Sequence, residues 1–194
     1  MEQQNFNCQA LIEDYTIGGQ QIKVVRDDLY PFIGGGSKAR KAVAYEQYLR
    51  ESGYNAVVTC GGVQSNHNRA MALMCARNGW KCHLCIQGTE DRFSNEKGNA
   101  LLDRLCGAEC ELIRPEDTAV AMDRAMEKLR TEGYKPYYVI GGGHNLPGGT
   151  CFVDAVRELK RQCDTNPTMC SWLRGQVPLK LVSLWVLTLW AGTM

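Results

Sequence analysis

The chain has 194 residues, of which 44% are apolar and 22% are charged. This is long enough to bury a core, and the composition is typical of a globular protein. A formal net charge of only +1 argues against electrostatic binding to nucleic acid or to an anionic membrane surface. No apolar run follows the polar start of the chain, so we expect no secretory signal and a cytoplasmic location.

Five short apolar runs predict strands, over residues 22–25, 56–60, 81–86, 109–113 and 137–140. Between and after them, helical spacing predicts helices over 39–49, through Met71 to Asn78, over 94–105 with Ser94 as N-cap, over 117–132 and over 149–162. Strands that alternate with helices predict an α/β fold with a parallel sheet and right-handed crossovers.

The ten cysteines are scattered along the chain, and only Cys82 and Cys85 have a spacing that resembles a metal site. Both lie in a predicted strand, where alternation sends them to opposite faces, and no second pair accompanies them. We therefore expect buried thiols and no metal site. His83, in the middle of the same strand, is predicted to be structural.

Two lysines follow the glycine turn at residues 34–36. Lys38 and Lys41 lie one turn apart at the start of a predicted helix, so both project from the same face. A glycine turn that leads into a helix N-terminus favours an anion, and a lysine amine can form a Schiff base with an aldehyde. A solvated basic loop is the alternative for this segment taken alone.

Two further glycine turns follow predicted strands, over residues 61–69 and 141–145. Ligands in parallel sheets bind beyond the carboxyl ends of the strands, so both turns could face one crevice. Neither turn has the spacing of a dinucleotide fingerprint, and the chain has no Gly-Lys-Ser/Thr of a phosphate loop. His144, on the second turn, is left unassigned.

The motifs taken together are similar to one family. They are Arg26-Asp27-Asp28-Leu29, Gly36-Ser37-Lys38-Ala39-Arg40-Lys41, the segment Gly61-Gly62-Val63-Gln64-Ser65-Asn66-His67-Asn68-Arg69, and Gly141-Gly142-Gly143-His144-Asn145. Their order and spacing resemble the pyridoxal-phosphate enzymes of the tryptophan-synthase-β fold type, in the D-cysteine desulfhydrase and 1-aminocyclopropane-1-carboxylate deaminase branch. The resemblance covers residues 22–162. One departure is Ser37, which stands where that family usually has asparagine.

The resemblance implies pyridoxal 5'-phosphate as cofactor and a role for each matching residue. Lys38 would hold the cofactor covalently and move the substrate α-proton, and Lys41 would reach the phosphate. Asn66 would hydrogen-bond the phenolic oxygen of the cofactor ring. Ser65 would bind the substrate carboxylate or relay a proton. Gln64 and His67 would line the substrate side, with His67 suited to proton transfer. From the residues alone, Ser65 and Asn66 could instead be helix caps, and His67 could be structural.

The family also implies two domains, a small α/β domain that is complete here and a larger one that is incomplete. We expect residues 1–51 to begin the large domain, 52–148 to form the small one and 149–194 to return to the large one. From about residue 164 the sequence no longer resembles the family. We interpret this as a frameshift or truncating lesion near Asp164, which the coding DNA would test. A membrane segment over 181–192 is the alternative, but about twelve residues are too few to span a bilayer.

The predicted function is that of a lyase or deaminase that converts a small amino acid such as D-cysteine to an α-keto acid, with release of ammonia and sulfide. This copy is expected to be impaired. The family's tendency implies a homodimer. The competing hypotheses are a non-catalytic fragment and a sugar- or nucleotide-binding α/β module without cofactor.

Overall fold

The computed structural model describes residues 9, 11–30, 34–95 and 97–163. Its main sheet has four parallel strands, β3 (Ala56–Gly62), β4 (Lys81–Gln87), β5 (Glu109–Ile113) and β6 (Pro136–Tyr138), in the order β5-β4-β3-β6. The two central strands, β3 and β4, are largely apolar and nearly continuous in burial, as expected for a parallel sheet covered on both faces. The predicted α/β fold with a parallel sheet is confirmed.

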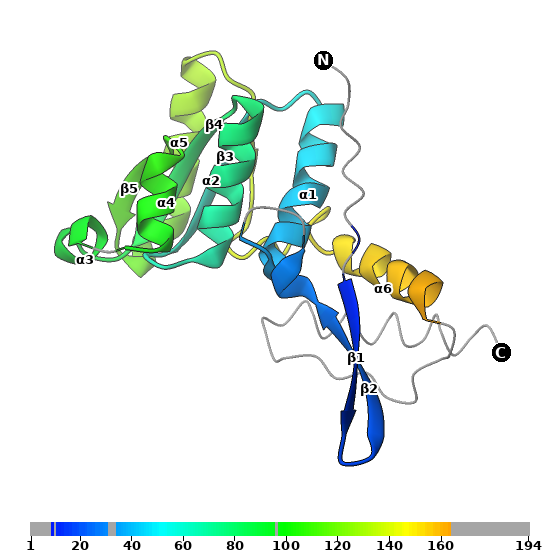
Figure 1. The fold of residues 1–194 in the computed structure, drawn as a ribbon. Coiled ribbons are helices and arrows are strands. Elements are labelled where there is room, and N and C mark those ends of the chain that lie inside the picture. Colours follow the sequence, from blue (N-terminus) through cyan, green and yellow to red (C-terminus); the bar gives the residue numbers. More distant parts are fainter. Residues whose placement is uncertain (1–8, 10, 31–33, 96, 164–194) are drawn as a thin grey trace.

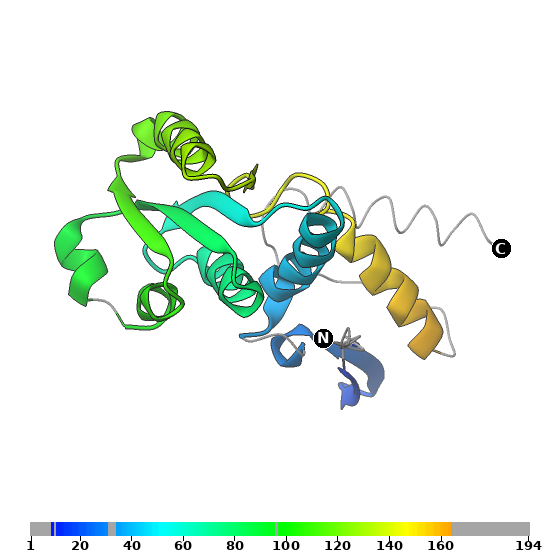
Figure 2. The same cartoon turned by 90° about the horizontal axis from the view of Figure 1, so that it is seen from above.

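Helices cover the two faces of this sheet (Figures 1 and 2). Helices α2 (Asn66–Asn78) and α4 (Asn99–Leu105) lie on one face, and α5 (Thr118–Thr131) lies on the other. The helix predicted over 117–132 is thus present as α5, and its apolar side chains form one buried stripe: Ala121, Met122, Ala125, Met126 and Leu129. A short helix, α3 (Glu90–Asn95), and a 3-10 turn, η2 (Pro115–Asp117), complete this part of the chain.

The remaining described elements lie beside the sheet. Strands β1 (Leu11–Ile17) and β2 (Gln20–Arg26) form an antiparallel hairpin that projects away from the sheet in Figure 1, followed by the 3-10 turn η1 (Asp27–Leu29). Helix α1 (Gly36–Glu51) packs against α2 on one side and α6 (Cys151–Gln162) on another. The Arg40 guanidinium, buried on α1, ties these parts together through Asp27 at 2.8 Å and Glu158 at 3.1 Å.

The structure corrects two details of the predicted elements. Ser94 does not cap a helix over 94–105. It lies inside α3, where its hydroxyl donates to Glu90, and this helix ends at Asn95, before α4 begins at Asn99. Strand β1 was not predicted, because Leu11–Ile17 carries acidic residues on a hairpin that stays mostly exposed.

The cysteine prediction follows the strand alternation. Cys82 belongs to the core cluster under α2, whereas Cys85 belongs to the cluster under α5, so the two thiols face opposite sides of the sheet. They therefore cannot share one metal ion.

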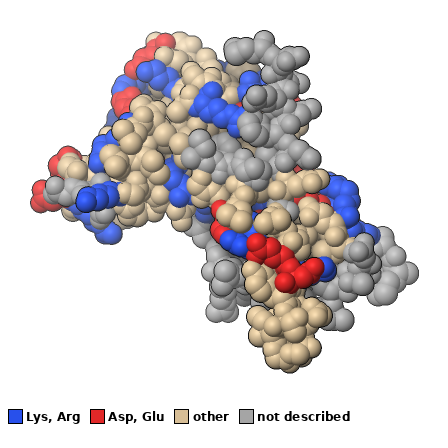
Figure 3. Space-filling model, viewed as in Figure 1, with Lys and Arg blue, Asp and Glu red and all other residues tan. Residues whose placement is uncertain are grey.

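Acidic and basic side chains are interspersed on the face shown in Figure 3, in keeping with the small net charge. Among the described residues, none of the helices is both long and apolar enough to cross a bilayer. The expectations for the segments after residue 163, including 181–192 and the lesion near Asp164, concern residues outside the described ranges. All four strands of the parallel sheet fall between residues 56 and 138, inside the range predicted for the small domain, and the domain division stays a prediction.

Candidate active site

Three glycine-rich turns meet at the carboxyl end of the parallel sheet. The turn after β3 leads into α2, the turn after β6 contains Gly142 and Gly143, and the turn at Gly34–Gly35 leads into α1. Gly35 requires glycine, because its φ is +56° and a Cβ there would stand 2.1 Å from the carbonyl oxygen of Asp28. The sequence places two lysines directly after this turn, on the first turns of α1.

Lys38 and Lys41 converge on one atom. Their Nζ atoms donate to the carbonyl oxygen of Gly142 at 3.0 Å and 2.7 Å. Lys41 is buried, and its Nζ also lies 5.8 Å from the centre of the Phe152 ring. The expectation that the two lysines project from the same helix face is confirmed.

The pairing changes the acid–base behaviour of both amines. Burial, together with the charge of the neighbouring Lys41 ammonium, lowers the pKa of Lys38 to about 8. Burial also lowers the pKa of Lys41. Near neutral pH, Lys38 therefore has a substantial fraction of the neutral amine, which is the nucleophilic form.

His67 is fixed in one tautomer by its neighbours. The Thr59 hydroxyl donates to the carbonyl oxygen of Val139 at 2.9 Å, so it must accept from His67 Nε2, which lies 2.9 Å away. The proton is thus on Nε2, and Nδ1 is a buried acceptor with no hydrogen-bond partner among the described residues. Burial, with Lys38 and Lys41 adding to it, lowers the pKa of His67 to about 3, so the ring is neutral at physiological pH.

Gly143 keeps these groups close to one another. Its φ is +65°, and a Cβ there would lie 3.2 Å from Lys41 Cδ and Tyr45 Cε2 and 3.3 Å from His67 Cε1. The β6–α6 turn thus packs closely against side chains of α1 and α2, whereas the crevice expected between the two glycine turns stays a prediction.

Ser65 and Asn66 begin helix α2. Ser65 is the N-cap, and its Oγ accepts from the backbone N–H of Asn68 at 3.2 Å. Asn66 Oδ1 accepts from Asn99 Nδ2 at 2.9 Å, so its own N–H groups are those that can reach a ligand. The cap role predicted as the alternative for Ser65 is present, and its O–H hydrogen stays available as a donor.

Gln64 is held away from the lysines by the start of α4. Its Nε2 donates to the carbonyl oxygen of Lys97 at 2.7 Å, and its Oε1 accepts from the Asn99 backbone N–H at 2.9 Å. The structure thus brings Lys38, Lys41 and His67 together, whereas Gln64 and Asn66 are gathered around Asn99.

Three residues that hold the predicted site residues in place were not predicted as part of the site: Asn99, Arg69 and Thr59. Asn99 bonds both Gln64 and Asn66, and Arg69 joins Asn99 Oδ1 at 3.2 Å to the carbonyl oxygen of Gly34 at 3.1 Å. Thr59 sets the tautomer of His67. A signal for Thr59 was available, because a hydroxyl in an otherwise apolar strand needs a partner when buried.

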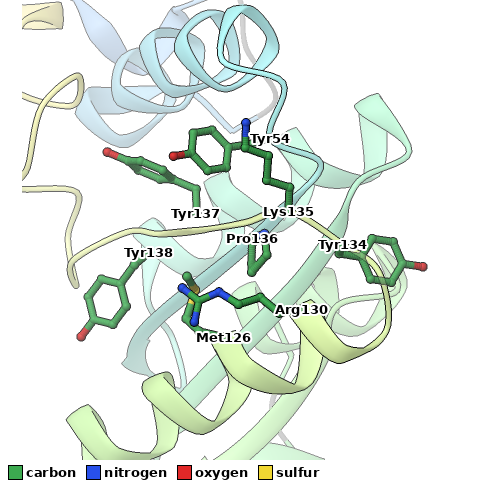
Figure 4. Close-up of a pocket in the computed structure, with 8 residues that line it drawn as sticks. All are labelled: Tyr54, Met126, Arg130, Tyr134, Lys135, Pro136, Tyr137 and Tyr138. Carbon is green, nitrogen blue, oxygen red and sulfur yellow. The ribbon is translucent and has the colours of Figure 1, made fainter.

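A surface pocket of about 420 Å³ lies elsewhere, beside β6 and α5 (Figure 4). Tyr54 and Pro136, which line it, sit at the amino ends of β3 and β6, opposite to the end that carries Lys38. Because ligands of parallel sheets bind at the carboxyl ends of the strands, we place the candidate site at the lysines and not in this pocket.

Comparison with known proteins shows which family the chain belongs to. Residues 12–172 match the family model described as pyridoxal-phosphate dependent enzyme. D-cysteine desulfhydrase of Klebsiella pneumoniae is 31% identical over 150 residues, which are 75% of this chain and 46% of that protein. The bifunctional D-cysteine desulfhydrase/1-aminocyclopropane-1-carboxylate deaminase of Arabidopsis thaliana is 32% identical over 157 residues, 77% of this chain and 39% of that protein.

Among solved structures, an ACC deaminase homologue superposes with a TM-score of 0.70 at 29% identity, covering 81% of this chain and 49% of the other. The chain spans about half the length of the relatives it matches, or less. The predicted family resemblance is confirmed.

Proposed function

Because the chain belongs to the family of pyridoxal-phosphate dependent enzymes, we propose that it carries the lysine-bearing half of a lyase or deaminase site for a small amino acid. For D-cysteine, the reaction consumes one water and yields an α-keto acid, ammonia and hydrogen sulfide. Two relatives have D-cysteine desulfhydrase in their names. The observation that carries the proposal is the pairing of half-buried Lys38 with buried Lys41 at the Gly142 carbonyl.

The residues present fit pyridoxal 5'-phosphate. An aldehyde needs an amine that is partly neutral near pH 7, and Lys38, with its pKa of about 8, is such an amine. A phosphate needs a cation nearby, and Lys41 is one helical turn away. In this proposal Lys38 holds the cofactor covalently, Lys41 contacts its phosphate, and the Asn66 amide donates to its phenolic oxygen. When bound, the cofactor supplies an electron sink for negative charge at the substrate α-carbon.

Lys38 is also the group that moves a proton. An amine whose pKa lies near the working pH can accept a proton at Nζ and return it with a small free-energy cost in either direction. Once the substrate amino group had replaced Lys38 on the cofactor, the freed Nζ would take the proton from the substrate α-carbon. The Ser65 hydroxyl, whose oxygen already accepts from Asn68, donates its hydrogen to the substrate carboxylate.

The proposal gives His67 a narrower role than the sequence suggested. With a pKa of about 3 and its Nε2 proton committed to Thr59, the ring does not act as an acid at neutral pH. Its Nδ1 lone pair can accept a hydrogen bond, so His67 orients a donor on the substrate side. The roles assigned to Lys38, Lys41, Gln64, Ser65, Asn66 and His67 all stay predictions.

Borohydride reduction tests the proposal directly. The 194-residue protein is incubated with pyridoxal 5'-phosphate, reduced and mapped by peptide mass spectrometry. We expect the label on Lys38, its loss in Lys38→Ala, and weaker but correctly placed labelling in Lys41→Met. Labelling spread over surface lysines, or unchanged in Lys38→Ala, would contradict it.

Two further measurements separate the competing hypotheses. Sulfide release from D-cysteine measures turnover, and label on Lys38 without turnover would favour the non-catalytic fragment. Ligand binding that survives Lys38→Ala would favour a module that needs no cofactor. The predicted homodimer is measured by sedimentation, and the predicted lesion near Asp164 by sequencing the coding DNA.

A further inference from the structure

The sheet face beneath α5 carries four side chains with metal-binding atoms. In the parallel pairing of β4 with β5, His83 stands beside Glu109 and Cys85 stands beside Glu111. Residues two apart on a strand share a face, so these four side chains form a two-by-two grid on the side away from α2. The spacing of Cys82 and Cys85 concerns one strand alone, whereas this grid joins residues of two neighbouring strands.

Three of the four converge. One ring nitrogen of His83, the Sγ of Cys85 and a carboxylate oxygen of Glu111 all lie within 4.8 Å of one another. Zinc holds such ligands at about 2.0–2.3 Å, which places tetrahedral donor atoms about 3.3–3.8 Å apart. The spacing in the structure therefore exceeds that of a bound zinc ion by at most about 1.5 Å, which side-chain movements would have to supply.

The hydrogen bonds around the cluster leave ligand atoms uncommitted. His83 is 3% exposed, and its Nδ1 makes no hydrogen bond with the described residues, although Glu109 Oε2 lies 3.7 Å from it. Its Nε2 lies 3.2 Å from Glu111 Oε2. Arg124 pairs with the other oxygen of Glu111, Oε1, so it can orient the carboxylate while Oε2 binds a metal.

The packing above the cluster leaves a path to solvent. Cys85 is fully buried in the cluster that includes Ala121 and Ala125 of α5. The Glu111 side chain remains 28% exposed. An ion can therefore enter along Glu111 and reach the buried thiol and imidazole behind it.

We propose that His83, Cys85 and Glu111 form a site for a zinc-like divalent cation, distinct from the lysine site at the carboxyl ends of the strands. A ligand set of one thiolate, one imidazole and one carboxylate suits Zn²⁺ among the common ions. Binding replaces the Cys85 thiol proton, which is released to solvent, and forms the metal–sulfur bond. Burial raises the pKa of this thiol to about 12, so the metal charge is what makes the thiolate favourable.

The test uses Co²⁺ as a spectroscopic substitute for zinc on the cofactor-free 194-residue protein. We expect one equivalent to give a thiolate-to-metal charge-transfer absorption that Zn²⁺ abolishes by competition. Cys85→Ser removes the absorption. Cys82→Ser is the matched control, because Cys82 is on the same strand, buried on the opposite face, and its loss leaves the absorption unchanged.

Glu111→Gln keeps the test decisive if the buried serine unfolds the protein, since Glu111 lies at the solvent edge. We expect at least tenfold weaker metal binding in this variant, with an unchanged circular dichroism spectrum. Absorption that is absent in the wild type, persists in Cys85→Ser, or has the same affinity in Glu111→Gln overturns the proposal. Because no cofactor is added, none of these results depends on the proposed function.

Discussion

Replacing Lys41 should raise the pKa of Lys38. Both amines donate to the Gly142 carbonyl, and the charge of Lys41 is a cause, after burial, of the low pKa of Lys38. Lys41→Met removes the charge and keeps an unbranched side chain of similar length in a buried position. The variant thus separates the electrostatic contribution from the contribution of burial.

The size of the effect follows from the spacing of the two amines. Because the two Nζ atoms lie 3.0 Å and 2.7 Å from the same oxygen, they are less than about 6 Å apart. Two like charges at about 5 Å repel by about 3 kcal/mol at an effective dielectric constant of about 20, and by about half of that where solvent reaches one of them. The smaller figure corresponds to about one pKa unit. At pH 8 the neutral fraction of Lys38 would then fall from about 50% to about 10%, a loss of about fivefold in reactive amine.

The assay is the pH dependence of reductive methylation at Lys38, read by peptide mass spectrometry. We expect the midpoint of the Lys38 profile near pH 8 in the wild type and about one unit higher in Lys41→Met. Lys160→Met, which removes an exposed cation from α6, serves as the control and should leave the midpoint in place. An identical midpoint in Lys41→Met and the wild type would refute the reasoning that the two charges interact.

Three further outcomes follow from buried groups outside the lysine pair. Glu158→Ala breaks a buried pair with Arg40 and should lower the free energy of unfolding by about 3 kcal/mol in urea titrations. Gly143→Ala places a Cβ at positive φ against Lys41, Tyr45 and His67, and should lower the unfolding free energy by about 2 kcal/mol. Asp103 has a pKa of about 7, raised by burial, so the folded state binds its proton more tightly than the unfolded state does. The Asp103 carboxyl therefore costs stability increasingly as pH rises from about 4 to 7, and Asp103→Asn should gain stability relative to the wild type over that window in thermal unfolding.

Each of the three has a matched comparison. Glu127→Ala breaks an exposed pair with Arg130 and should change the unfolding free energy by less than about 1 kcal/mol. Gly107→Ala also places alanine at positive φ but meets no atom within 4 Å, so its cost should be smaller than that of Gly143→Ala. An advantage of Asp103→Asn that is the same at pH 4 and pH 7 would show that folding does not raise the pKa of the Asp103 carboxyl.

The elements most accessible to sequence reasoning were those with a single strong period. The stripe of α5 and the strand Glu109–Ile113 could be located because one face of each is apolar and the other is not. The N-cap predicted at Ser94 was wrong. A serine before an apolar run is typical of an N-cap, but here the residues before Ser94 belong with it to a separate short helix, α3. Local patterns do not report where the chain breaks between two short helices.

The candidate site likewise has contacts that local sequence patterns predict and contacts that they do not. The proximity of Lys38 and Lys41 could be predicted from helical spacing, and the meeting of two glycine turns from the parallel topology. The Gly142 carbonyl, Asn99 and Arg69 could not be, because their contacts join segments about 30 to 100 residues apart. The neutral state and tautomer of His67 depend on burial and on the Thr59 hydroxyl of strand β3. The residues that adjoin His67 in the sequence reveal neither.

The Gly142 carbonyl competes with any ligand for both lysines. An anion that draws Lys38 and Lys41 to itself must exchange two existing hydrogen bonds for new ones, so the measured affinity is the difference between the two sets. The same exchange would release the β6–α6 turn from its attachment to α1. Anion binding at the two lysines should thus be measurable as faster amide hydrogen exchange at residues 141–145, without any turnover of substrate.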